Sequence, residues 1–128
     1  MSAHIDAIKT WLGTLGLPSS YKIQYGEWKD TGVSTDRYIV IAPDGGLRAE
    51  PWFRQPLVRL LIIGCTNESA LVTNGTESVT NGIIQAVRAL GKIDGLILLE
   101  CANDAIGPAR TTDSRPWYQI NLRCLVNY

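Results

Sequence analysis

Histidine and cysteine are scarce in this sequence, and their positions exclude the common catalytic and metal sites. The chain has one histidine and three cysteines in 128 residues. His4 falls on the first turn of a predicted helix, where it cannot complete a triad with a cysteine buried in a strand. Cys65, Cys101 and Cys124 are dispersed and have no histidine partners, so they do not form a zinc site. We predict buried thiols in a reducing compartment, no catalytic residue, no metal and no cofactor.

An excess of one charge and long apolar runs are also absent. Lys+Arg and Asp+Glu both number 12, so the formal net charge is zero. A neutral chain has no electrostatic attraction for nucleic acid or an anionic membrane, and low net charge permits self-association. No apolar run approaches the ~20 residues that cross a bilayer, and the first residues lack the pattern of a signal peptide. We therefore expect no membrane partner and no sequence-specific nucleic-acid partner.

The most informative stretch that is present is residues 117–128, in which apolar and polar residues alternate. From Tyr118 to Tyr128 every second residue is apolar, and the residues between them are largely polar. Because strand side chains point alternately to opposite faces, this stretch predicts a strand with one apolar face. An antiparallel sheet covered by helices on one side needs such strands. At 128 residues, we expect a single domain over residues 1–128.

The remaining elements complete an α+β fold in the order α-β-β-β-α-β-β. Apolar residues at helical spacing predict helices over 3–15 and between Asn74, its cap, and Gly91, its stop. We expect one mixed, mostly antiparallel sheet of about five strands, with both helices packed on one face. The four strands before the last are predicted at 21–28, 37–42, 57–63 and 95–101.

Pairing within the sheet follows from the turns and from the apolar pattern. The first two strands are expected to form a hairpin. The third is apolar on both faces except for Arg59, which is typical of a central strand.

Two connections, 47–56 and 102–116, are longer than the ~4–6 residues that are usual in small domains. The second has the composition of an exposed, extended arm. Arginines and aromatic residues in or beside both connections are typical of a protein–protein interface, although they would equally cap the ends of the core. The interface candidates are Arg48, Trp52, Phe53, Arg54, Asp104, Arg110, Asp113, Arg115 and Trp117.

A second group of candidates lies within the predicted central strands, on the face that the helices leave uncovered. If this face meets a neighbouring subunit or lines a channel, these side chains make the contacts. If it faces solvent, they need no special role, and the sequence leaves both interpretations open. The group is Arg59, Gln119, Asn121 and Arg123.

Three stretches, together with the order of elements, resemble the tail terminator proteins of long-tailed bacteriophages, also described as minor tail or tail completion proteins. They are the first helix, Ile5–Leu15, the segment PWFRQPLVRL at 51–60, and the ending SRPWYQINLR at 114–123. The resemblance implies a structural virion protein without catalytic residues. It implies a ring, six copies in the family, that stops polymerisation of the tail tube and forms the head-joining surface.

The same resemblance implies the partners and the location. The partners would be other copies of the chain, the tail tube protein and head–tail connector or neck proteins, with DNA passing through the ring. Assembly would take place in the cytoplasm of the bacterial host. Two alternatives remain: a neck or head-completion protein of the same particle, and a small ligand-binding or enzymatic domain with a cleft under residues 47–56.

Overall fold

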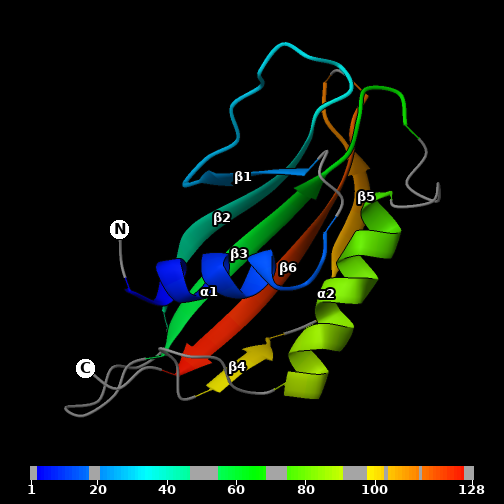
Figure 1. The fold of residues 1–128 in the computed structure, drawn as a ribbon. Coiled ribbons are helices and arrows are strands. Elements are labelled where there is room, and N and C mark those ends of the chain that lie inside the picture. The colour runs from blue at the N-terminus through cyan, green and yellow to red at the C-terminus, as the bar shows by residue number, and fades with distance from the viewer. Residues whose placement is uncertain are drawn as a thin grey trace.

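The computed structural model describes residues 3–17, 21–46, 55–68, 75–90, 98–102, 104–112 and 114–125. Two helices and six strands lie in these ranges (Figure 1). The elements are α1 (Ala3–Gly13), β1 (Tyr21–Tyr25), β2 (Arg37–Gly46), β3 (Pro56–Ile63), α2 (Thr76–Leu90), β4 (Leu98–Cys101), β5 (Ile106–Arg110) and β6 (Pro116–Leu125). Neither of the two described helices is long and apolar enough to span a membrane. The predicted cap and stop of the second helix, Asn74 and Gly91, lie outside the described residues.

The strands form one mixed sheet in the order β1-β2-β3-β6-β4, and β5 pairs with the free part of β6. The antiparallel pair β3–β6 runs from Leu57 opposite Arg123 to Ile63 opposite Trp117. Both strands therefore lie in the interior of the sheet, which confirms the prediction of a central strand over 57–63. The prediction of an α+β fold with a single sheet is also confirmed.

The main core lies between the sheet and the two helices, which pack on the same face (Figure 1). From β6 it receives Ile120, Leu122 and Cys124, as the alternation predicted. Ile8 of α1 and Ile83 of α2 are fully buried against these strands. The apolar side chains that recur every second residue on the strands thus pack against those that recur about every 3.6 residues on the helices.

The first two strands do not form the predicted hairpin. They run parallel, from Tyr21 opposite Arg37 to Tyr25 opposite Ile41. Two parallel neighbours cannot be joined by a tight turn, because the chain must return along the sheet to the level at which the first strand began. Residues 26–36, here called the crossover loop, make this return, and Trp28 of this loop packs edge-on against Tyr38, with ring centroids 5.8 Å apart.

The predicted exposed, extended arm over 102–116 contains a sixth strand, β5, which is itself mostly exposed, so the strand count of about five needs correction. Because β4 pairs only with the distal part of β6, the edge of β6 near Trp117 is left for β5, and Ala109 pairs there with Trp117. The unpaired backbone N–H and C=O groups at this edge of β6 are stabilised by hydrogen bonds to another strand. At Gly107, φ is 138° and an added Cβ would lie 2.8 Å from the carbonyl oxygen of Trp117.

The three cysteines are free thiols, as predicted, but only Cys124 is fully buried. Cys65 and Cys101 are half-buried, because Cys65 follows the end of β3 and Cys101 is the last residue of β4. Burial raises the pKa of the Cys124 thiol to about 12. This thiol is therefore protonated and unreactive at neutral pH.

Candidate functional site

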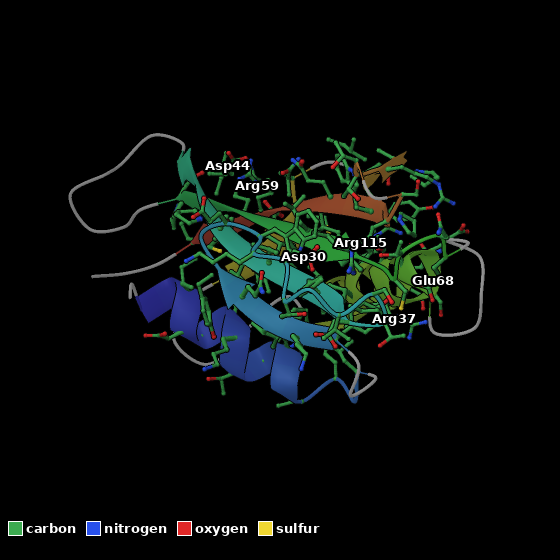
Figure 2. The ribbon with its side chains drawn as sticks, turned by 90° about the horizontal axis from the view of Figure 1, so that it is seen from above. Asp30, Arg37, Asp44, Arg59, Glu68 and Arg115 are labelled. Carbon is green, nitrogen blue, oxygen red and sulfur yellow. The ribbon has the colours of Figure 1, made fainter. Side chains whose placement is uncertain are left out.

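The face of the sheet opposite the helices, here called the open face, carries the candidates from the central strands. Its paired positions are Arg59 opposite Asn121, Leu61 opposite Gln119, and Ile63 opposite Trp117. Arg123 follows on the same face by alternation. Figure 2 shows Arg59 on the side of the sheet away from α1. The structure therefore brings Arg59, Gln119, Asn121 and Arg123 together on one face, and their role in an interface or a channel stays a prediction.

Three of these four polar side chains have partners on the open face itself. The Gln119 side-chain amide donates to Asn121 Oδ1 at 3.0 Å. Arg123 forms an ion pair with Glu100, which is its register partner on β4. This pair is exposed, so it contributes at most about 1 kcal/mol to stability.

Arg59 differs, since its Nε–H is buried and has no acceptor among the described residues. Figure 2 shows Asp44 near Arg59, but no ion pair joins Arg59 to it or to another described carboxylate. A buried donor without an acceptor costs about 1–3 kcal/mol.

A groove of about 320 Å³ lies on the open face beside Arg59. The crossover loop contributes Trp28, whose indole Nε1–H is likewise buried without an acceptor among the described residues. Two tryptophans and an arginine in one hollow are the residue types that dominate binding energy at protein interfaces. The lining residues are Trp28, Arg59, Leu61, Ile63, Thr111, Trp117 and Gln119.

Arg115 fixes the crossover loop that forms one wall of this groove. Its guanidinium donates from Nη1 to the carbonyl oxygens of Asp36 at 2.7 Å and Gly64 at 3.1 Å, and from Nη2 to that of Val33 at 3.1 Å. The Asp30 carboxylate lies 3.6 Å away, and Figure 2 shows it beside Arg115. One planar cation with five donors thus ties the loop to the end of the sheet.

The prediction that Arg115 lies in an exposed arm is wrong, because the side chain is only 1% exposed. Its guanidinium carbon also lies 5.9 Å from the Trp28 ring centroid and 5.3 Å from that of Tyr38. Backbone carbonyls accept the hydrogen bonds of this guanidinium, and aromatic rings pack against it. The sequence does not show which carbonyls and rings lie close to Arg115, so its burial could not be predicted. Sequence reasoning missed Thr111 as a lining residue, since the fold alone brings it to the open face.

The other interface candidates are divided between exposed positions and undescribed ones. Asp104 is exposed, and Arg110 is exposed while its Nη1 donates to the Ser114 carbonyl at 2.8 Å. Trp117 is half-buried and lines the groove. The candidates that lie outside the described residues are Arg48, Trp52, Phe53, Arg54 and Asp113.

A second hollow, of about 310 Å³, lies beside the Glu100–Arg123 pair and is lined also by Gln55, Cys124 and Leu125. Most of the segment 47–56, under which a ligand cleft was predicted, lies outside the described residues. The thiol of Cys124 has a raised pKa and is not an activated nucleophile. Within the described ranges, no group of three or more His, Cys, Asp or Glu side chains is placed to hold a metal ion.

Arg37 and Glu68 form an ion pair that joins the start of β2 to the turn after β3 (Figure 2). Burial acts to raise the pKa of the Glu68 carboxyl, but hydrogen bonds from Arg37 and from the Cys65 amide outweigh it and hold the pKa below its usual value. The Arg37 guanidinium also lies 5.6 Å from the Tyr21 ring centroid. This cluster holds the β1 edge to the core and does not open into the groove.

The profile of a family described as phage tail termination protein matches residues 1–128. The chain belongs to this family. The family resemblance expected from the three sequence stretches is thereby confirmed. As a phage tail termination protein, the chain is a structural component of the tail and hence of the virion.

Comparison with solved structures supports the fold of this tail termination protein. One solved chain matches with a TM-score of 0.56 at 13% identity, over 98% of this chain and 91% of that chain. At this identity the match shows the fold alone. No curated protein matches the sequence.

Proposed function

We propose that this protein forms a closed ring, of six copies, on the end of the phage tail tube, where it stops polymerisation and presents the surface that joins the head. The observation that carries this proposal is the match to the phage tail termination family over residues 1–128. The partners are other copies of the chain, the tail tube protein and head–tail connector or neck proteins. DNA passes through the ring, and assembly takes place in the host cytoplasm.

The open face of the sheet supports an assembling subunit. In the described part of the chain, no helix covers this face, and it carries the groove lined by Trp28, Trp117 and Arg59. Tryptophan and arginine in a hollow are typical of residues that become fully desolvated in complexes. The formal net charge of zero leaves little repulsion between copies.

Two measurements test the proposal. The native mass of the purified protein, with negative-stain imaging of any oligomer, tests the ring, and six-fold closed particles are expected. Addition to polymerising tail tube protein tests termination, and the expected result is shorter tubes with protein at one end only. Unchanged tube lengths, with no protein at tube ends, would contradict termination.

The tube assay also separates the two alternatives. A neck or head-completion protein would bind finished tails or head connectors without changing tube length. A ligand-binding or enzymatic domain would bind neither, and the hollow near Gln55, with its paired Glu100 and Arg123, would be its site.

A further inference from the structure

We propose that the groove on the open face receives the segment Asp104–Ile106 of a second copy, with the neighbour's Asp104 carboxylate pairing with Arg59 and its Ile106 covering the two tryptophans. This inference rests on the proposed self-association and names the contact between neighbouring copies.

The groove is lined by one cation, Arg59, and by no carboxylate. The Nε–H groups of Arg59 and Trp28 are buried, and neither has an acceptor in the described ranges. No described carboxylate of the same copy forms an ion pair with Arg59. A half-buried guanidinium in a largely apolar hollow calls for an anionic oxygen, because charge-assisted hydrogen bonds are roughly twice as strong as neutral ones. The occupant therefore carries a carboxylate.

The rest of the groove is mostly apolar, apart from Thr111 and Gln119, and calls for an aliphatic group beside that carboxylate. Leu61, Ile63 and the rings of Trp28 and Trp117 line it. Its volume is about 320 Å³. A hollow of this size has room for two side chains, one charged and one aliphatic.

Asp104–Ile106 is the described segment with this chemistry. Ile106 and Val33 are the large apolar side chains that the described structure leaves exposed, each at 48%. The carboxylates near Val33 are already engaged, since Asp30 pairs with Arg115 and Asp36 accepts from the Thr31 hydroxyl. Asp104 is exposed and takes part in no ion pair or hydrogen bond with the described residues. It therefore presents a free carboxylate two residues from an exposed isoleucine.

The positions of the two surfaces suit a contact between copies. Ile106 pairs with Gln119 at the edge of the sheet, but it is not among the residues that line the groove of its own copy. Each copy can therefore use its groove for one neighbour and its β5 segment for another. Such head-to-tail contacts between two different patches are the kind that generate rings.

Charge reversal tests the contact directly. Arg59→Glu places two carboxylates together at each contact, and Asp104→Arg places two guanidiniums together. Each variant alone is expected to associate about tenfold or more weakly than the wild type, as measured by native mass spectrometry and sedimentation. A mixture of the two variants restores both kinds of contact in alternating copies, so it is expected to assemble, and so is the double variant.

The mixture removes misfolding as an explanation, because a misfolded variant would not recover on mixing. Circular dichroism of each variant gives an independent check of the fold. Asp6→Arg, at an exposed position on α1, is the matched control for reversing one surface carboxylate and is expected to associate like the wild type.

The outcomes separate this inference from the proposed function. If both single variants form the same rings as the wild type, or if folded variants do not recover when mixed, the groove contact is overturned and the ring stands. If the wild type forms no oligomer alone or on tail tubes, the ring fails and this contact fails with it.

Discussion

Arg115 lies over the ring of Tyr38, with 5.3 Å between its guanidinium carbon and the ring centroid, and is almost completely buried. The same guanidinium donates to carbonyls of the crossover loop that stand about 80 positions earlier in the chain. One side chain thus determines how residues 26–36 lie on the open face, and with them the wall of the groove.

Replacement of Arg115 by lysine should destabilise the fold. An ammonium group cannot reproduce the planar donor array that reaches the carbonyls of Val33, Asp36 and Gly64. We expect the free energy of unfolding to fall by about 2 kcal/mol, measured by urea denaturation. Proteolysis should also become faster within residues 26–36. Arg110→Lys is the matched control, because Arg110 is exposed on the neighbouring strand and should change stability by less than about 0.5 kcal/mol.

Substitution of glycines should have opposite signs at two positions. At Gly107, φ is 138° and an added Cβ would lie 2.8 Å from a carbonyl oxygen, so Gly107→Ala should loosen β5 from β6 and destabilise the protein. At Gly82, inside α2, an added Cβ meets nothing within 4 Å, so Gly82→Ala should stabilise by up to about 1 kcal/mol. Thermal unfolding of both variants measures the difference, and equal shifts in Tm would contradict the β5 pairing.

Stability should decrease with acid through Glu68. Its carboxyl has a pKa below the ordinary value of 4.5 in the folded protein, so the ionised form is favoured by folding. The stabilisation is therefore complete above that ordinary value and is lost as pH falls through the lower, folded-state pKa. Urea denaturation from neutral pH to pH 3 should show Glu68→Gln with a weaker pH dependence than the wild type. Glu27→Gln, at an exposed position, controls for loss of one negative charge. An unchanged slope in Glu68→Gln would show that the ion pair with Arg37 contributes nothing.

Alkylation should leave Cys124 unmodified in the native protein. Burial raises the pKa of its thiol to about 12, so the reactive thiolate is scarce at pH 8 and the sulfur is inaccessible as well. Iodoacetamide followed by mass spectrometry should detect modification of Cys124 only after denaturation. Cys65 and Cys101, which are half-buried, serve as internal comparisons and should react first.

The sequence determined the parts of the fold that depend on alternation. The apolar face of β6 and the central place of β3 follow from side chains at a period of two, and so does the shared face of Arg59 and Asn121. The parallel pairing of β1 with β2 could not be predicted, because it depends on the path of the crossover loop. That path is set by hydrogen bonds from Arg115 to backbone carbonyls. Every residue has a backbone carbonyl, so the residue types of the loop do not indicate which ones accept these bonds.

The candidate site was predictable to the same extent. Gln119 and Trp117 were expected at or near an interface, and both line the groove. Arg115 was assigned to an exposed arm because the composition of residues 102–116 suits one. Only the fold shows that carbonyls and aromatic rings surround it.

The position of β6 in the sheet has a consequence for synthesis of the protein. β6 is the last described strand to leave the ribosome, yet it lies in the interior of the sheet between β3 and β4. Until it arrives, β3 has no partner on one side, and the apolar faces of the earlier strands and of both helices share an incomplete layer. The nascent chain therefore cannot reach its native topology strand by strand, and folding must wait for pairings that are distant in sequence. Because an interior strand of the sheet is added last, the apolar surfaces of the earlier elements are open to association with other chains during translation. We expect host chaperones to protect them.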